Sequence, residues 1–470
     1  MSAASPITDW TGYGFDTRQV HAGEYPDQNH GLRVPPIALS AGYLFEDFDD
    51  QASRFDGSIH WHPEEAGPGG DSGAGGFSPS ERSPIYSRQG NPTNWVAEER
   101  LASLEGGTVA VAVSSGQAAI SSALFALAQH GDHIVSTGSI YGGTRILFGR
   151  SFKRFGIDFD YVWDADDDAE WERAIRPETK AIFTESIPNP RNDITDLRRI
   201  AEVAARYNLP VVVDNTVGTP ALIRPIEHGC HIVVHSTTKF LTGHGAAVGG
   251  AIVDGGNFDW AAAERAGRSY PLITQSSRPG VAPMLDRFGK GAYARAVRES
   301  VVNDIGPSLS PFNGFLLHQG METLSLRMER HVRSSHRIAA WLETQPEVVS
   351  VDYAGLPSSP LHERAVRDYG LDPDTGLART GSVFGVTVRG GLAGAREFMN
   401  GLRVFSRMTG IGDTRSMVLH PGTTTHGTFP PDVNERLGIT PGLLRLSVGI
   451  ESAEDLVRDL RGALDRVAAL

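Results

Sequence analysis

The sequence predicts an α/β protein in which a mainly parallel sheet is followed by a second, smaller α/β domain. Between about residues 91 and 255, strand-like and helix-like segments alternate, as is typical of a parallel sheet with helices on both faces. After about Pro311 this alternation gives way to a long helical pattern and more widely spaced strands. At 470 residues the chain exceeds the usual size of one domain, so two domains and an N-terminal arm are expected.

The predicted strands of the first domain are short apolar runs rich in β-branched residues. Such runs predict strands that are buried on both faces. They lie at 109–113, 133–137, 158–163, 181–185, 210–214, 231–236 and 250–253. Segments with apolar residues at helical spacing separate them, at 95–104, 118–129 and 196–207.

The second domain begins with a helical pattern. Apolar residues recur three or four positions apart, which predicts one long helix that links the domains. They are Met321, Leu324, Met328 and Val332. Strands are expected at 348–353, 382–388, 417–420 and 443–448, and a last helix at 453–468. The expected organisation is an arm at 1–85, a large domain at 86–311 and a C-terminal domain at 312–470.

The segment 56–84 interrupts the pattern because it is crowded with Gly, Ser and Pro, which predicts a long loop. Its glycines lack the G-x-G-x-x-G spacing and follow no strand, so a dinucleotide site is not expected there. His60 and His62 with Glu64 could suggest a metal site. Two histidines two positions apart in a loop are weak support, and we predict no metal.

Composition narrows the possible partners. A net charge of −13, without a run of Lys or Arg, argues against a nucleic-acid-binding protein. The single cysteine, Cys230, excludes an internal disulfide, fits a reducing compartment and is expected to be a small buried residue. The first basic residue is Arg18, which argues against a signal peptide, and no apolar stretch has the length of a membrane span. We therefore expect a cytoplasmic protein that binds neither nucleic acid nor a membrane.

Lys239 and Asp214 are the strongest chemical signal in the sequence. Each closes or closely follows a strand-like run, so both are expected at the edge of the sheet where parallel strands end. A lysine and an aspartate at neighbouring strand ends suit pyridoxal phosphate. The lysine amine would form a Schiff base with the aldehyde, and the aspartate would keep the pyridine nitrogen protonated. An ordinary buried ion pair is the alternative.

A phosphate group also needs a binding site. Gly116 and Gln117 follow the strand at 109–113 and open a helix, so their free amides could face an anion. Ser236 and Thr238, just before Lys239, add hydroxyl donors from another strand end. Each feature alone could be an ordinary helix cap or turn, whereas their joint placement favours a phosphate site.

Two further residues follow strands of the same sheet. The ring of Tyr141 could stack on a flat cofactor, or simply pack against its neighbours. The side chain of Asn189 could donate to a phenolate oxygen of the cofactor, although Asn before Pro is also common in turns.

Several motifs resemble the Cys/Met-metabolism family of pyridoxal-phosphate enzymes, which includes cystathionine synthases and lyases, methionine γ-lyases and homoserine-ester sulfhydrylases. The most specific block runs from Val-Asp-Asn-Thr at 213–216 to His-Ser-Thr-Thr-Lys-Phe at 235–240. The resemblance extends from Thr-Arg-Gln-Val-His-Ala-Gly at 17–23 to Arg-Leu-Ser-Val-Gly-Ile-Glu at 445–451. It implies the fold-type I, aspartate aminotransferase-like fold of pyridoxal-phosphate-dependent transferases.

The resemblance also implies roles for individual residues. Lys239 would be the Schiff-base lysine and proton shuttle, Asp214 the pyridinium partner and Tyr141 the stacking ring that assists catalysis. Arg445 would grip the substrate α-carboxylate with Ser416 beside it, although Arg445 could also be an ordinary strand-end arginine. These assignments follow from motif matches at 139–143, 213–216, 235–240, 412–416 and 445–451.

The segment Tyr-Ser-Arg-Gln-Gly-Asn-Pro-Thr at 86–93 resembles the family segment that reaches the cofactor phosphate of a neighbouring subunit. Tyr86 and Arg88 would be the contacting residues. The resemblance therefore implies a homotetramer that is built from dimers with shared active sites.

Three features resemble the sulfhydrylase branch of the family. Phe-Leu-Thr-Gly-His-Gly at 240–245 contains the Gly-His-Gly of that branch, and Gly143 stands where methionine γ-lyases have a reactive cysteine. The chain length and the segment Ile-Val-Asp-Gly-Gly at 252–256 also suit the sulfhydrylase branch. The implied reaction is γ-replacement, in which O-acetyl-L-homoserine and sulfide give L-homocysteine and acetate. The alternatives are a cystathionine γ-synthase, a γ-lyase that gives a 2-oxo acid, and a non-catalytic binding protein with the same fold.

Overall fold

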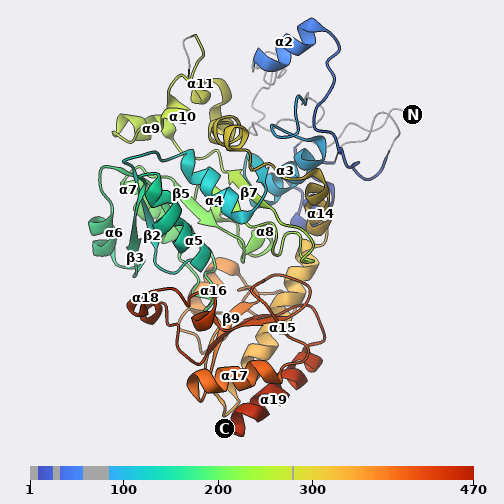
Figure 1. Ribbon diagram of the computed structural model, residues 1–470, viewed down its shortest axis with the longest axis vertical. Helices are drawn as coiled ribbons and strands as arrows, with labels where there is room; N and C mark the ends of the chain where they lie inside the picture. The colour runs from blue at the N-terminus through green and yellow to red at the C-terminus, as the bar shows by residue number, and fades with distance from the viewer. Residues whose placement is uncertain (1–8, 25–31, 57–83, 278–279) are drawn as a thin grey trace.

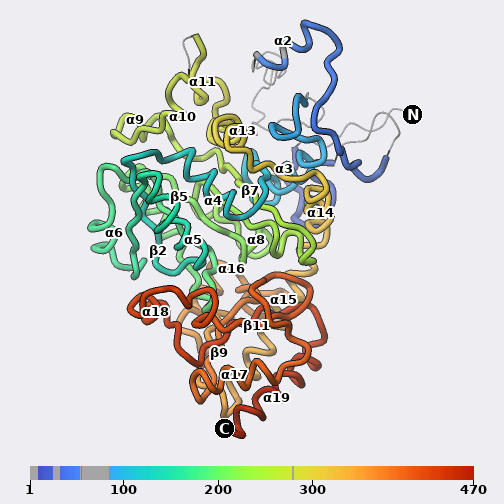
Figure 2. The backbone as a smooth tube through the Cα atoms, in the orientation of Figure 1, coloured from blue at the N-terminus to red at the C-terminus, as the bar shows by residue number. Residues whose placement is uncertain are grey.

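The computed structural model describes residues 9–24, 32–56, 84–277 and 280–470, which form two α/β bodies stacked along the long axis (Figures 1 and 2). The upper body contains a seven-stranded sheet and the lower body a five-stranded sheet. The predicted α/β fold, with a second and smaller α/β part, is confirmed.

The upper sheet has the strand order β1-β7-β6-β5-β4-β2-β3. Strand β7 runs antiparallel to both of its neighbours, whereas the remaining neighbouring strands run parallel. The sheet is therefore mainly parallel, as predicted. Its strands are β1 (Val109–Val113), β2 (His133–Thr137), β3 (Asp158–Val162), β4 (Thr179–Glu185), β5 (Val211–Asp214), β6 (Ile232–His235) and β7 (Gly250–Asp254).

Apolar side chains cover both faces of this sheet and alternate along each strand. In β5, Val211 and Val213 join the core on one face, and Val212 joins the core on the other. Helix α3 (Pro92–Glu105) contributes to the first core and α4 (Gly116–Phe125) to the second. A polar residue at a strand end therefore faces either the α3 side or the α4 side of the sheet.

The helices between these strands agree less closely with the prediction. The helix expected at 118–129 is α4, which begins two residues earlier because the hydroxyl of Ser115 accepts a hydrogen bond from the amide of Ala118. The helix expected at 196–207 is α7 (Leu197–Arg206). Five short helices that the sequence did not predict follow β7: α9 (Trp260–Arg265), α10 (Pro271–Thr274), α11 (Met284–Phe288), α12 (Ala292–Ala296) and α13 (Asn303–Ile305).

The predicted long helix that links the domains is two helices, α14 (Pro311–Met321) and α15 (Leu324–Glu343). The guanidinium of Arg327 donates to the carbonyl of Gly320 at 2.6 Å and to that of Phe240 at 2.7 Å. It thereby satisfies a carbonyl near the end of α14 and stabilises the break. The sequence pattern concealed the break because its four apolar residues enter one core: Met321, Leu324, Met328 and Val332.

The lower body is a five-stranded sheet in the order β10-β11-β12-β9-β8, flanked by α17 (Gly391–Gly401) and α19 (Ala453–Ala468). The predicted strands are present, with ends that differ by one residue. The two-residue β10 was not predicted, because both of its residues are exposed. The strands are β8 (Val348–Asp352), β9 (Val383–Val388), β10 (Ser406–Arg407), β11 (Met417–Leu419) and β12 (Leu443–Ser447).

The N-terminal arm begins with α1 (Phe15–His21), which packs on α3, and then carries α2 (Phe48–Asp56) away from the upper body (Figure 1). Helix α2 extends to the first residue of the predicted loop 56–84. Of that loop, only this residue and Pro84 are described, and His60, His62 and Glu64 lie outside the described residues. Among the described helices, none combines the length and hydropathy needed to cross a membrane.

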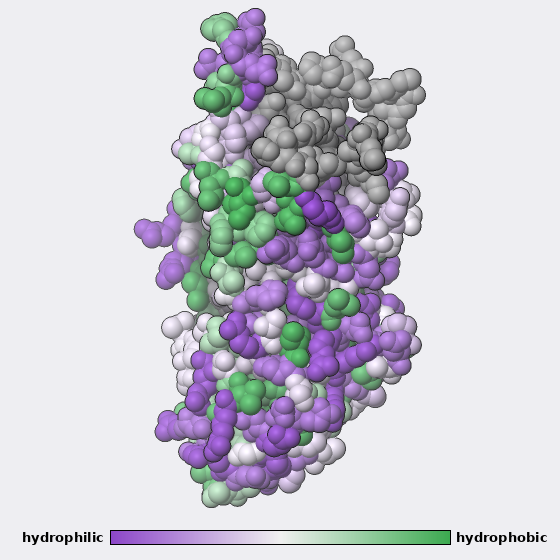
Figure 3. Space-filling view, turned by 90° about the vertical axis from the view of Figure 1, so that its right-hand side faces the viewer, coloured by the Kyte–Doolittle hydropathy of each residue, from purple (hydrophilic) through white to green (hydrophobic). Residues whose placement is uncertain are grey.

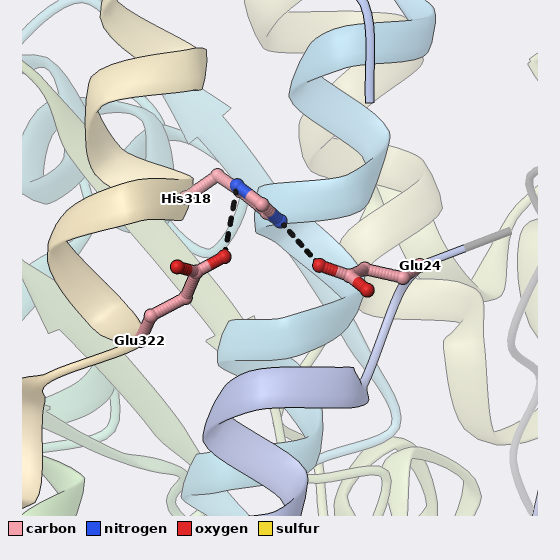
Figure 4. A group of neighbouring side chains, drawn as sticks. All are labelled: Glu24, His318 and Glu322. Carbon is pink, nitrogen blue, oxygen red and sulfur yellow. Dashed lines mark ion pairs between the residues drawn. The ribbon is translucent and has the colours of Figure 1, made fainter. Parts of the chain in front are cut away.

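A polar cluster anchors the arm to α14. Figure 4 shows the imidazole of His318 between the carboxylates of Glu24 and Glu322, at 3.5 Å and 3.8 Å. The three side chains have the spacing of metal ligands. However, the fully buried guanidinium of Arg100 lies 3.2 Å from Glu24 and 3.5 Å from Glu322. Because this cation already compensates the carboxylates, we interpret the cluster as an anchor rather than a metal centre.

Candidate active site

The candidate site lies where β4, β5 and β6 end. Asp214 is the last residue of β5, and Lys239 lies four residues beyond β6, which pairs with β5 in parallel. Parallel neighbours end at the same edge of a sheet, so the fold brings both residues to one edge, as the sequence predicted.

Asp214 is 9% exposed and is held by Thr216. Its Oδ1 accepts hydrogen bonds from the Thr216 amide at 3.0 Å and from the Thr216 hydroxyl at 2.5 Å. The same hydroxyl accepts from the amide of Ser236 at 2.8 Å, so it couples Asp214 to the end of β6. Burial raises the pKa of Asp214, whereas the Thr216 hydrogen bonds and nearby His235 lower it.

A buried polar network lies on the α3 side of these strand ends and was not predicted. The Oε1 atom of Glu105 contacts His235 Nε2 at 2.6 Å and accepts from Asn215 Nδ2 at 2.9 Å. The Asn215 Oδ1 accepts from the Ser186 hydroxyl at 2.7 Å. One signal could have revealed it: His235 is a polar residue that continues the apolar run Ile-Val-Val of β6.

Lys239 is partly buried in a tight turn after β6. Its amide donates to the carbonyl of Ser236 at 3.1 Å, which fixes the turn through the backbone. Burial lowers the pKa of the Lys239 amine, and the guanidinium of Arg445 lowers it further. A larger share of the neutral amine is therefore available as a nucleophile or base.

The N-terminus of α4 and the turn after β6 meet closely. A Cβ atom on Gly116 would lie 2.6 Å from the Cβ of Ser236, so only glycine allows this approach. The free amides at 116 and 117 and the Ser236 hydroxyl are therefore neighbours, as a phosphate site requires. The hydroxyl of Thr238 instead donates to the carbonyl of Gly249 at 3.2 Å.

Tyr141 lies beside this helix terminus. A Cβ atom on Gly143 would lie 2.5 Å from the Tyr141 ring and 3.0 Å from Gln117 Nε2, so the three residues are close together. The tyrosine is 41% exposed, which leaves area for a flat ligand to stack. Its amide donates to Glu185 Oε1 at 2.6 Å. Burial raises the pKa of the Tyr141 phenol, which keeps it protonated near neutral pH.

Arg445, from β12 of the lower body, reaches the same site. Its Nη1 donates to Asn189 Oδ1 at 3.4 Å, and its Nη2 donates to the carbonyls of Thr409 at 3.0 Å and Gly410 at 2.8 Å. The side chain is 3% exposed, and burial lowers its pKa to about 10. Its Nε is buried without a hydrogen-bond partner, which fits a site for an anionic group.

Ser416 does not join this group, although the sequence placed it beside Arg445. In the antiparallel pair β11–β12, Arg445 lies opposite Leu419, so Ser416 is three residues farther along, or about 10 Å. Its buried hydroxyl donates to Glu451 Oε2 at 2.9 Å and accepts from the amide of Gly449 at 2.9 Å. These contacts give Ser416 a structural role, and the backbone at 409–410 lies beside Arg445 instead.

Among the contacts of the described residues, none joins Tyr86 or Arg88 to a predicted site residue outside this pair. Arg88 Nε donates to Asn303 Oδ1 at 3.4 Å, and the guanidinium lies 5.4 Å from the centroid of the Tyr86 ring. The Tyr86 side chain is exposed. Both residues are therefore accessible to a second molecule.

The residues gathered at this edge fit pyridoxal phosphate. A helix N-terminus and a hydroxyl suit the phosphate, a partly buried amine suits the aldehyde, and a buried carboxylate suits the ring nitrogen. An accessible aromatic ring and a buried guanidinium complete the set. Such a site would hold a cofactor and an amino-acid carboxylate side by side.

Comparison with known proteins agrees with this chemistry. A family model described as Cys/Met metabolism PLP-dependent enzyme matches residues 16–465. An O-acetyl-L-homoserine sulfhydrylase of Corynebacterium glutamicum is 39% identical, with 96% of each chain covered. A homocysteine synthase of Schizosaccharomyces pombe is also 39% identical, over 96% of this chain and 98% of the relative.

Among solved structures, a putative O-acetylhomoserine (thiol)-lyase of Campylobacter jejuni superposes with a TM-score of 0.86. It is 31% identical, and the match covers 96% of this chain and all of that one. That structure contains a pyridoxyl-lysine phosphate group.

Proposed function

The chain belongs to the Cys/Met metabolism family of pyridoxal-phosphate-dependent enzymes, and we propose that it makes L-homocysteine and acetate from O-acetyl-L-homoserine and sulfide. It is an enzyme of the alkyl-transferring class, and pyridoxal phosphate is its cofactor. The reaction belongs to methionine and cysteine metabolism. The single observation that carries the proposal is the convergence of Lys239, Asp214 and Arg445, from both bodies, on one sheet edge.

Each residue has a defined task in this proposal. When bound, the cofactor supplies an electron-accepting ring that acidifies the Cα and Cβ protons of the substrate. Lys239 would hold the cofactor through its aldehyde, and its amine, once free, would take the Cα proton of the substrate. Its lowered pKa suits this role because more of the amine is unprotonated near neutral pH. Lys239 would also take the Cβ proton, after which the Cγ–oxygen bond would break and release acetate. The sulfur of the hydrosulfide ion would then bond to Cγ, and protons would return to Cβ and Cα to give L-homocysteine.

The other residues bind and orient. Asp214 would keep the cofactor ring nitrogen protonated, Tyr141 would offer its ring for stacking, and Asn189 would be a donor for the phenolate oxygen. Arg445 holds the α-carboxylate of the substrate through its guanidinium. The amides of Gly116 and Gln117 and the Ser236 hydroxyl would hold the phosphate. Thr238 would contribute its hydroxyl only if that hydroxyl left the carbonyl of Gly249.

The proposed assembly is a homotetramer of dimers, in which Tyr86 and Arg88 of one protomer approach the phosphate of the next. Both side chains are accessible in the single chain. The arm that precedes them has large apolar side chains in solvent, including Leu44 at 93% and Phe48 at 79% exposure. On the face in Figure 3, apolar residues gather over the upper body, whereas the lower body is mainly hydrophilic. Exposed apolar surface of this kind supports contact between subunits.

We also propose a cytoplasmic location. The chain has one cysteine, Cys230, and it is buried as expected. Burial raises the pKa of this thiol, which keeps it unreactive. A chain without a disulfide suits a reducing compartment.

A substrate panel tests the proposed reaction. Purified enzyme is supplied with O-acetyl-, O-succinyl- or O-phosphohomoserine and with sulfide, methanethiol or cysteine. The expected best pair is O-acetylhomoserine and sulfide, with kcat/KM about 10-fold or more above the other pairs. Cystathionine as the main product would identify a cystathionine γ-synthase. Sulfide-independent release of 2-oxobutanoate would identify a γ-lyase.

The carboxylate site is tested with Arg445→Lys. Lysine cannot donate two parallel hydrogen bonds to a carboxylate, so about one charge-assisted hydrogen bond, worth roughly 1.5–3 kcal/mol, is lost. The expected result is a roughly 10- to 100-fold lower kcat/KM for the homoserine ester, mainly through KM. Arg415→Lys, at an exposed arginine paired with Asp413, is the matched control. An unchanged KM in Arg445→Lys would contradict the assignment.

A further inference from the structure

Two buried carboxylates stand side by side at the centre of the site. Glu185 ends β4 and Asp214 ends β5, and the parallel register pairs these two residues directly. Neighbouring strands are about 4.8 Å apart, and paired residues point to the same face. The two side chains are 4% and 9% exposed. Two like charges this close and this buried repel strongly, so the pair holds one proton.

The hydrogen bonds decide which carboxyl holds the proton. Asp214 accepts two hydrogen bonds from Thr216 and has His235 nearby. Glu185 accepts one, from the amide of Tyr141 at 2.6 Å. Since donors stabilise the ionised form, Asp214 is the anion and Glu185 the acid. Burial and then the charge of Asp214 raise the pKa of Glu185 well above its usual range, in agreement with this assignment.

The charged and titratable groups around the pair lie in or next to three elements. Tyr141 precedes α5 (Gly142–Ile146) and interacts with both carboxyls. His235 ends β6 and interacts with Asp214. Arg445, from β12, acts on Tyr141 and on Lys239, which follows β6. The two cations therefore face Tyr141 and the cofactor side of the site, and neither forms an ion pair with Glu185 among the contacts of the described residues.

We propose that Glu185 is a positioning residue of the cofactor site, a protonated carboxyl that holds the backbone of Tyr141 to the end of β4 and leaves the single negative charge of the pair on Asp214. Glu185 thereby fixes the position of the Tyr141 ring, which would stack on the cofactor, and the charge of Asp214, which would pair with the ring nitrogen. The inference rests on the cofactor but goes beyond the proposed reaction, because it requires neither a particular ester nor a particular thiol.

Glu185→Gln is the decisive variant, since glutamine has the shape of a protonated glutamate and keeps the acceptor for the Tyr141 amide. In the holoenzyme, cofactor affinity is expected to stay within about 3-fold of the native value. The pH midpoint of the visible absorbance of the bound cofactor is expected to stay within about 0.3 units. If Glu185 were ionised, glutamine would remove a negative charge and lower this midpoint by about one unit or more.

Infrared spectroscopy observes the proton directly. At about pH 8 the native holoenzyme is expected to show a carbonyl band of a protonated carboxyl that is lost in Glu185→Gln. Asp254 and Asp193 are matched controls, because burial raises the pKa of each, that of Asp254 to about 7. The band must persist in Asp254→Asn and Asp193→Asn. A band that persists in Glu185→Gln would overturn the proposal.

Two further results keep the proposal open to refutation if Glu185→Gln does not fold. An infrared spectrum of the native holoenzyme that shows no protonated-carboxyl band at about pH 8 would by itself overturn the proposal. Glu185→Ala, which leaves the Tyr141 amide without its acceptor, is expected to lower cofactor affinity by about 10-fold. None of these measurements uses substrate. A failed sulfhydrylase assay with the expected spectra would therefore reject the proposed reaction alone.

Discussion

Replacement of Lys239 by alanine is expected to abolish covalent attachment of pyridoxal phosphate and to lower turnover by at least about 10²–10⁴-fold. In the proposed mechanism the Lys239 amine has two tasks, to hold the aldehyde and to move the Cα proton, and positioned proton transfer alone contributes a factor of this size. Its pKa is lowered by burial and by Arg445, so a larger share of this amine is neutral near neutral pH. Visible absorbance of the purified protein and steady-state turnover measure the two losses.

The variant is expected to fold. The turn that carries Lys239 is closed by backbone hydrogen bonds, from its amide to the Ser236 carbonyl and from the Gly243 amide to its own carbonyl. Both remain in alanine. An unchanged thermal unfolding midpoint between the cofactor-free forms of the variant and the native protein would show that lost activity reflects chemistry and not stability.

Borohydride reduction followed by peptide mapping identifies the attachment site. The chain has four lysines, at positions 153, 180, 239 and 290, so the assignment is unambiguous. The exposed Lys153 provides a matched control, and Lys153→Ala is expected to keep both absorbance and turnover. A pyridoxyl adduct on any lysine other than Lys239, or turnover retained in Lys239→Ala, would contradict the assignment.

The strand ends could be predicted from sequence because their signal is local. Asp214 and Lys239 follow apolar β-branched runs, and parallel strands bring such ends to one edge without knowledge of strand order. The reversed direction of β7 could not be predicted, because a strand buried on both faces shows the same apolar run in either direction.

Residues that act through distant partners were missed or misplaced. Glu105 and His235 are 130 positions apart, and Glu185 meets Asp214 only through strand register. Ser416 was placed beside Arg445 from a local match, whereas its partner is Glu451, which the pairing of β11 with β12 brings close. The spacing of these residues along the chain does not indicate which of them are in contact in the fold.

Asp214→Asn is the second variant with a large expected effect, a loss of about 10²–10³-fold in kcat. In the proposed mechanism Asp214 keeps the ring nitrogen protonated. A neutral amide could not do so, and the ring would then accept electrons less readily as the Cα proton leaves. A loss of this size in kcat is typical when one preorganised electrostatic partner is removed from a buried active site. Cofactor affinity is expected to fall as well, because the cationic ring loses its counter-charge.

The substitution isolates charge from shape. The side-chain oxygen of asparagine can still accept both hydrogen bonds from Thr216, so the link from Thr216 to Ser236 is retained. Asp214→Glu keeps the charge but moves the carboxylate, and the two variants together separate charge from position. Single-turnover rates with saturating cofactor measure the loss at the chemical step. If Asp214→Asn keeps these rates within about 3-fold while Asp214→Glu loses them, packing rather than charge governs this position, and the role of Asp214 as pyridinium partner is wrong.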